Sequence, residues 1–90
     1  MNKERRKSLT NLAEQLRDIF GKLEDMRSEF ETLRDEEQEY FDNMPESFQS
    51  GEKGSAAENA VNAIEEAVGY LEEITDTIEN AAAAADTAAE

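Results

Sequence analysis

The chain has 90 residues, of which 38% are hydrophobic and 36% charged, with a mean hydropathy of −0.82 and a formal net charge of −14. A chain of this length forms at most one small domain, and so few apolar residues make a core that is only marginally stable alone. Cysteine and histidine are absent, which excludes disulfides and the usual zinc ligands and leaves oligomerisation as the remaining support for the core. No apolar run approaches the roughly 18 residues of a membrane span, and no signal sequence is recognisable, so we expect a cytoplasmic protein.

The charge is unevenly distributed along the chain. Residues 1–34 carry eight basic and seven acidic groups, a net charge of +1, whereas residues 35–90 carry sixteen acidic groups and a single basic one, Lys53, a net charge of −15. This distribution disfavours direct binding to nucleic acid or to an anionic membrane, because both need clustered Lys and Arg. It is compatible with a basic protein partner, or with a protein surface that normally holds DNA.

The first predicted element is a helix over about residues 3–43. If Leu9 is position a of a heptad, every a and d position from 9 to 44 except Glu37 is apolar: Leu9, Leu12, Leu16, Ile19, Leu23, Met26, Phe30, Leu33, Tyr40 and Met44. This series predicts a coiled-coil seam formed by the a and d rows. Ala13, Phe20 and Phe41 at e positions widen the apolar stripe, which favours a bundle of more than two helices.

Glycine and proline mark the interruptions. Gly21 lies inside the first predicted helix, where we interpret it as a tolerated defect rather than a close backbone approach. Pro45 ends the helix, and a loop is predicted over residues 44–54. Phe48 is the one large apolar residue of this loop and is expected to fold back onto the end of the hairpin.

A second helix is predicted over about residues 55–84, with Ser55 and Glu58 forming a capping box at its start. Its apolar face has smaller side chains than that of the first helix, and the alanine-rich end has little to bury, so fraying is expected after about residue 82, with a frayed tail over 85–90. The predicted fold is therefore all-α, an antiparallel two-helix hairpin resembling a coiled coil, which we expect to dimerise into a four-helix bundle.

Catalytic chemistry is not indicated, and we expect neither an enzyme nor a cofactor. Histidine and cysteine, which carry most acid/base and nucleophilic chemistry, are absent. The pairs Glu65/Glu66 and Glu72/Glu73 could suggest a carboxylate-bridged metal site, but di-iron bundles complete such sites with histidine. No calcium loop or phosphate-binding loop is present, so no metal site is predicted.

Two groups of residues are candidates for contact with a partner. The first is a carboxylate array that could imitate the phosphates of DNA or could simply keep the rod soluble, and it comprises Glu58, Glu65, Glu66, Glu72, Glu73, Asp76 and Glu79, with Asp35, Glu36, Glu39 and Asp42 on the other helix. The second is the aromatic group near the turn, Tyr40, Phe41 and Phe48. Aromatic residues are enriched at interfaces, but these three could equally close the turn as a local core.

The segment Asp42-Asn-Met-Pro-Glu-Ser, followed by the Ile64-Glu-Glu-Ala and Leu71-Glu-Glu-Ile repeats, resembles small acidic helical proteins of phages and prophages. The resemblance covers about residues 35–80, and its specific part is the turn. It implies a viral accessory origin, with a location in the host cytoplasm, and assigns no activity to any residue.

The sequence thus favours an acidic protein-interaction module, encoded by a phage, that binds and inhibits a host protein such as a nucleic-acid or defence enzyme. The alternative is a structural or oligomerisation module without inhibitory activity. Salt dependence separates the two hypotheses, because capture of a basic partner by charge weakens at high salt and packing of apolar rows does not.

Overall fold

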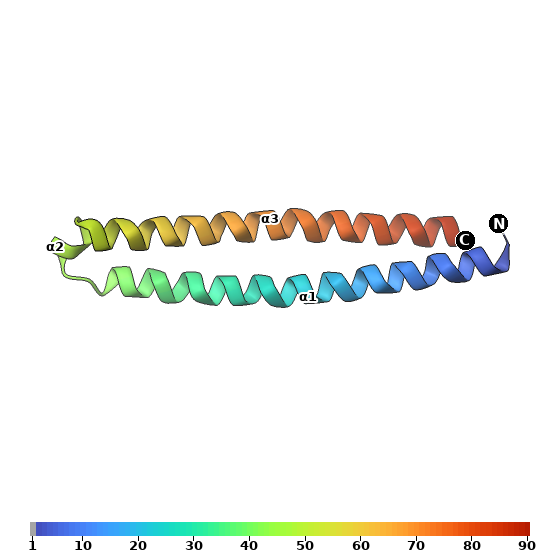
Figure 1. Cartoon of the computed structure of the whole chain (residues 1–90), viewed down its shortest axis with the longest axis horizontal. Helices are drawn as coiled ribbons and strands as arrows, with labels where there is room; N and C mark the ends of the chain where they lie inside the picture. The colour runs from blue at the N-terminus through green and yellow to red at the C-terminus, as the bar shows by residue number, and fades with distance from the viewer. Residues whose placement is uncertain (1) are drawn as a thin grey trace. The chain divides into compact units, whose positions relative to one another are not determined.

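The computed structural model describes residues 2–90, and these form three helices: α1 (Lys3–Asp42), α2 (Glu46–Gln49) and α3 (Glu52–Ala89) (Figure 1). The described residues contain no strand. They divide into two compact units, one made of the chain up to Asp25 with Leu71–Glu90 and the other of Met26–Tyr70. In each unit a segment of α1 packs antiparallel against a segment of α3, which confirms the all-α hairpin predicted from the sequence.

Side chains at both ends of α1 form hydrogen bonds with backbone groups of its first and last turns. At the start, the side-chain Oδ1 of Asn2 accepts a hydrogen bond of 2.8 Å from the backbone N–H of Arg5, which makes Asn2 the N-cap. At the end, the carbonyl oxygen of Phe41 accepts two hydrogen bonds, one of 3.1 Å from the backbone N–H of Met44 and one of 3.0 Å from Nε2 of Gln49. Pro45 follows closely and prevents the helix from continuing.

The connection between the long helices is more ordered than the predicted loop over 44–54. Residues Glu46–Gln49 form the single turn α2, in which the backbone N–H groups of Phe48 and Gln49 donate to the carbonyl oxygen of Pro45 at 2.9 and 3.0 Å. Helix α3 then begins at Glu52, three residues before the predicted start.

The predicted capping box at Ser55 is wrong. The backbone N–H of Ser55 donates to the carbonyl oxygen of Gly51 at 3.0 Å, so Ser55 already lies inside the first turn of α3. The prediction of a frayed tail over 85–90 is also not what the structure has, because α3 continues to Ala89. Alanine has the highest helix propensity, and Ala82 is fully buried near this end. Both the intrinsic propensity of the residues and their packing against α1 therefore stabilise the helix there.

The seam between the helices uses a different pair of rows from the predicted one. In the Met26–Tyr70 unit, the α1 positions turned towards α3 are a and e, namely Phe30, Arg34, Glu37, Phe41 and Met44. In the other unit they are again a and e: Leu9, Ala13, Leu16, Phe20 and Leu23. The predicted a row is therefore confirmed, whereas the d row is wrong as an in-chain contact, because all five of its apolar members are exposed.

Helix α3 presents the same two rows when Ala57 is taken as position a. Its buried side chains recur at steps of four and seven residues, and they are Ala57, Val61, Val68, Thr75 and Ala82. Most of them are small, and Ala13 on α1 is also fully buried. Small residues at the seam let two helix backbones approach closely, so each unit is a thin pair of helices with a narrow core.

Candidate interaction surfaces

The heptad positions place the exposed side chains on defined sides of each helix. At 3.5 residues per turn, successive residues are about 103° apart, so the b row lies about 77° to one side of the centre of the a/e contact face and the d row about 77° to the other. Both helices use a and e and run antiparallel, so rows with the same letter lie on the same side of the seam. One observed contact supports this placement, because Arg17 at position b of α1 reaches Glu79 and Asp86 at position b of α3.

The b row of α3 is entirely acidic and is called the acidic row below. It comprises Glu58 and Glu65 in the Met26–Tyr70 unit, and Glu72, Glu79 and Asp86 in the other unit. Of the six predicted carboxylates, Glu65, Glu72 and Glu79 belong to this row. All six are exposed, including Glu66, Glu73 and Asp76 outside the row. The acidic row lies on the side of the seam opposite the d row.

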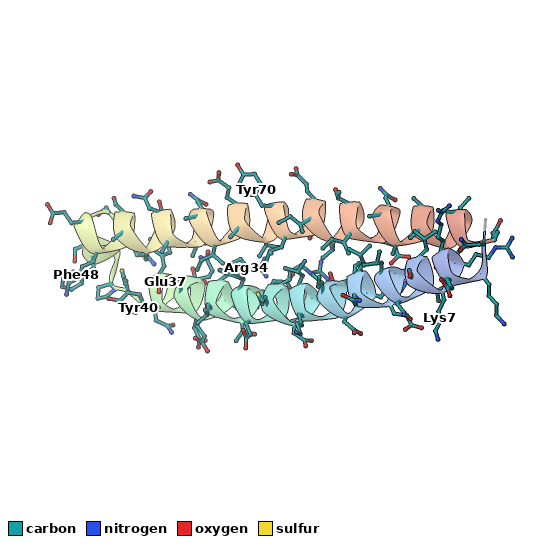
Figure 2. The ribbon with its side chains drawn as sticks, turned by 45° about the vertical axis from the view of Figure 1, so that its right-hand side comes forward. Lys7, Arg34, Glu37, Tyr40, Phe48 and Tyr70 are labelled. Carbon is teal, nitrogen blue, oxygen red and sulfur yellow. The ribbon has the colours of Figure 1, made fainter. Side chains whose placement is uncertain are left out.

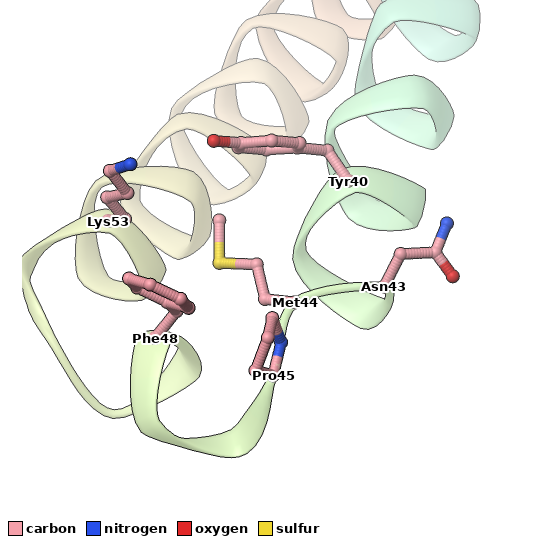
Figure 3. Close-up of a pocket in the computed structure, with 6 residues that line it drawn as sticks. All are labelled: Tyr40, Asn43, Met44, Pro45, Phe48 and Lys53. Atoms are coloured by element: carbon pink, nitrogen blue, oxygen red, sulfur yellow. The ribbon is translucent and has the colours of Figure 1, made fainter.

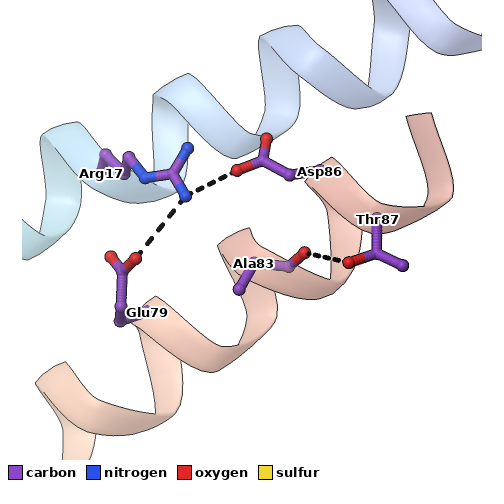
Figure 4. A network of polar contacts seen from close by, with 5 residues as sticks. All are labelled: Arg17, Glu79, Ala83, Asp86 and Thr87. Carbon is purple, nitrogen blue, oxygen red and sulfur yellow. Dashed lines mark hydrogen bonds and ion pairs between the residues drawn. The ribbon is translucent and has the colours of Figure 1, made fainter. Parts of the chain in front are cut away.

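Arg17 partly neutralises the acidic row near its C-terminal end (Figure 4). Its Nη2 lies 2.7 Å from Oδ2 of Asp86 and 3.5 Å from Oε1 of Glu79. The hydrogen bond to Asp86 raises the pKa of the Arg17 guanidinium, which is already fully protonated at neutral pH. The three side chains are 41% to 50% exposed, so this cluster is a solvated surface contact with little effect on stability.

The other candidate carboxylates of α3 lie further round the helix. Glu66 and Glu73 occupy position c, opposite the seam, and Asp76 occupies position f. The hydroxyl group of Tyr70 donates to Oε1 of Glu66 at 3.2 Å. Figure 2 shows Tyr70 projecting from the side of α3 that faces away from α1.

The acidic residues of α1 are not brought together with those of α3. Glu39 occupies position c, which points away from α3, and Asp35 and Asp42 occupy position f. Asp35 accepts a hydrogen bond from Arg34 at 3.1 Å, and Asp42 accepts one from Gln38 at 2.9 Å. Position f lies on the same side of the seam as position b but points outward. Within the Met26–Tyr70 unit these carboxylates therefore lie on the outer surface of α1 and do not join those of α3 in the one array that the sequence had suggested.

The aromatic residues of the turn are split by the structure (Figure 3). Tyr40 and Phe48 line a shallow pocket with Asn43, Met44, Pro45 and Lys53. Tyr40 is 54% and Phe48 49% exposed, and Nζ of Lys53 lies 5.5 Å from the centroid of the Phe48 ring, a cation–π distance. Phe41 is half-buried at an e position of the seam and does not line this pocket.

The surface that sequence reasoning missed is the exposed d row of α1, called the apolar row below. Its members are 46% to 54% exposed: Leu12 and Ile19 in one unit, and Met26, Leu33 and Tyr40 in the other. Every d position of α1 from 12 to 40 is apolar, whereas the e row holds Arg27 and Arg34 beside its apolar members, so periodicity alone favoured the a and d rows over the a and e rows that face α3. The width of the stripe was the available signal, since one partner helix cannot cover three rows.

Two further features of residues 2–90 bear on function. No group of three or more carboxylates in this range is arranged to hold a metal ion. No helix within the same range is long and apolar enough to cross a membrane.

The chain matches no known family model, and neither the curated proteins nor the solved structures contain a significant match to it.

Proposed function

We propose that the chain is a protein-interaction module that acts through helix packing and surface charge. The observation that carries this proposal is the separation of exposed side chains in each unit, with the apolar row of α1 on one side of the seam and the acidic row of α3 on the other. Large apolar side chains exposed in a line favour protein contacts. In this proposal two hairpins join into a four-helix bundle through their apolar sides and leave the acidic sides outermost.

The exposed carboxylates of α3 from Glu58 to Glu79, called the acidic side of the hairpin, are proposed to bind a basic protein. Seven carboxylates of α3 fall between Glu58 and Glu79, which corresponds to one about every 4 to 5 Å at 1.5 Å per residue. This spacing is close to the charge spacing of about 3.4 Å along one strand of DNA. A host enzyme that normally holds nucleic acid is therefore the proposed target, and occupation of its basic groove would inhibit it.

Charge neutralisation with a matched control tests this proposal. In the test variant, Glu65, Glu66, Glu72 and Glu73 are replaced by Gln; in the control, Asp18, Asp25 and Asp42 are replaced by Asn and Glu39 by Gln. The two variants have the same net charge, but the control changes only the outer side of α1. Affinity purification with mass spectrometry from the host identifies basic partners, and binding of each recovered partner is then measured for both variants.

We expect the test variant to lose at least about tenfold in affinity and the control to stay close to the original chain, because local charge complementarity and not total charge positions the partner. Equal losses in both variants would show that binding follows net charge only. Recovery of no basic partner would contradict the proposal that the acidic side binds one.

The exposed apolar row favours a second function, a structural module whose role is to join chains. In that case self-association is the whole activity, and neutralising the acidic side leaves function intact. A phage origin, suggested by the turn sequence, fits either function and is tested by the genomic neighbourhood of the coding sequence.

A further inference from the structure

The apolar side of the hairpin carries a row of large residues on one helix beside small ones on the other. On α1 the apolar row has Met26, Leu33 and Tyr40 within the Met26–Tyr70 unit. The same-lettered d row of α3 lies on the same side of the seam and has Ala60 and Ala67 in this unit. Large and small rows thus lie side by side on one surface.

The small row of α3 is bordered by a second row without charge. Positions d and g from 56 to 84 contain no Asp, Glu, Lys or Arg, and we call them the alanine rows: Ala56, Ala60, Ala63, Ala67, Tyr70, Ile74, Thr77, Ala81 and Ala84. In a chain of net charge −14, this is the side on which another acidic molecule can approach α3 without meeting a carboxylate.

The level of each residue along the Met26–Tyr70 unit follows from the seam. The inward positions of α1, counted towards the turn, are 30, 34, 37, 41 and 44, and those of α3, counted back to the turn, are 68, 64, 61, 57 and 54. When the two series are paired in this order, the residue numbers of each pair add up to 98. Residues of α1 and α3 at the same level along the unit therefore have numbers that add up to 98. Residue 33 is therefore level with residue 65, midway between Ala63 and Ala67, and Tyr40 is level with residue 58, midway between Ala56 and Ala60.

We infer that a second copy of this chain covers the apolar side, with α1 of each copy lying on the alanine rows of α3 of the other. This inference rests on the proposed packing function and specifies its partner and arrangement. A two-fold axis parallel to the helices produces it, because such an axis places α1 over α3 of the partner at the same level. Leu33 then enters the space between Ala63 and Ala67 of the partner as a knob enters a hole.

Self-complementarity favours a second copy over a different protein as the occupant. Each copy supplies both the large row and, from Ala56 to Ala67, small rows that receive it, so one surface satisfies both halves of the interface. Beyond Ala67 the same rows add the exposed apolar side chains Tyr70 and Ile74. The same arrangement places Glu29 and Glu36, which flank the apolar row, beside uncharged alanine rows. The opposite arrangement, with α1 on α1, would pair large with large and alanine with alanine and would leave the two helix pairs at unequal spacing.

The exposed surface is also large enough to supply such an interface. The chain exposes 6492 Å², whereas a folded monomer of 10.1 kDa exposes about 5,300 Å². A stable interface buries about 800 Å² on each partner. Burial of that area would leave each chain exposing about 5,700 Å², much nearer the surface expected for a monomer of its mass.

Single-cysteine variants test the arrangement, because the chain has no cysteine of its own. Leu33→Cys and Ala67→Cys are prepared separately, mixed, equilibrated and oxidised, and disulfide-linked chains are separated by mass. We expect a disulfide between the two different variants in the mixture and none in either variant alone. A disulfide needs Cα atoms less than about 7 Å apart, and in this arrangement two copies of residue 33 are diagonal to each other.

Met26→Cys serves as the discriminating variant. With α1 on α1 in antiparallel orientation and the two apolar rows in full overlap, the two copies of residue 26, the middle member of the row, would meet at the two-fold axis and link to each other. That disulfide would overturn the proposed arrangement. Absence of the mixed disulfide would overturn it as well. Neither result bears on the acidic side, whose binding is measured separately with the charge variants.

A matched pair of substitutions that each introduce one negative charge tests whether the second copy covers the apolar side of the hairpin. Leu33→Glu should convert the sedimenting species from two chains to one, whereas Thr32→Glu on the outer side of α1 should leave it at two. Circular dichroism checks that both variants remain helical. A single-chain species for the original protein at 100 micromolar would overturn the second copy as the occupant.

Discussion

Glycine positions show how differently one residue type acts within one chain. An added Cβ at Gly54 would overlap the backbone of Gln49, since this buried glycine lies where the chain leaves α2 and enters α3. At Gly21 and Gly69 an added Cβ would meet nothing within 4 Å. The interpretation of Gly21 as a tolerated helix defect is therefore confirmed, while the close approach at Gly54 could not be predicted, because it depends on the path of α2.

Replacement of these glycines by alanine should have opposite effects. Gly21→Ala and Gly69→Ala should each raise the free energy of unfolding by about 0.5 to 1 kcal/mol, since alanine has the higher helix propensity and meets no obstacle. Gly54→Ala should lower it, because the backbone around Gln49 has to move. Urea unfolding followed by circular dichroism measures all three variants. A Gly54→Ala variant as stable as the original chain would contradict the close packing of the turn.

Among the helices, the seam was only half predictable from the sequence. Leu16, Leu23 and Phe30 at position a lie at the in-chain contact, as the heptad pattern indicates. The pattern favoured d over e, because all five d positions from 12 to 40 are apolar and only Ala13, Phe20 and Phe41 are apolar at e. Arg27 and Arg34 also occupy e positions, where the pattern indicates no seam contact, yet both are half-buried.

The turn and the candidate surfaces were also only partly predictable from the sequence. Pro45 correctly marks the end of α1. The backbone hydrogen bonds that form α2, to the carbonyl oxygen of Pro45, and the one that starts α3, to the carbonyl oxygen of Gly51, could not be predicted from the sequence. The acidic composition of α3 was evident from the sequence. The separation of the α3 carboxylates from those of α1 was not evident from the sequence, because it depends on which heptad rows form the seam.

Close packing of the helices at Ala13 gives a prediction at the scale of the element. Ala13 is fully buried, so Ala13→Leu should force the helices of its unit apart and lower the free energy of unfolding by roughly 1 to 3 kcal/mol. Ala83→Leu adds the same side chain at an exposed position of α3 and serves as the control. Chemical denaturation compares the two variants. Equal stability would indicate that the seam at Ala13 has room for a larger side chain.

Across the whole molecule, a net charge of −14 opposes association of two copies and favours association with a basic partner. The two proposed contacts therefore respond to salt in opposite directions. Added salt screens the repulsion between two acidic chains, while the apolar rows that hold them together are unaffected by screening. The same salt weakens attraction between the acidic row and a basic protein.

Between 50 and 500 mM NaCl we expect the dimer dissociation constant to stay constant or fall, and the affinity for a basic partner to fall at least about tenfold. Sedimentation equilibrium measures the first quantity, and fluorescence anisotropy with the partner recovered by affinity purification measures the second. The Leu33→Glu variant separates the contacts further, because it should lose the dimer and keep the salt-sensitive binding. A dimer that dissociates as salt rises would mean that ion pairs, and not the apolar and alanine rows, join the two copies.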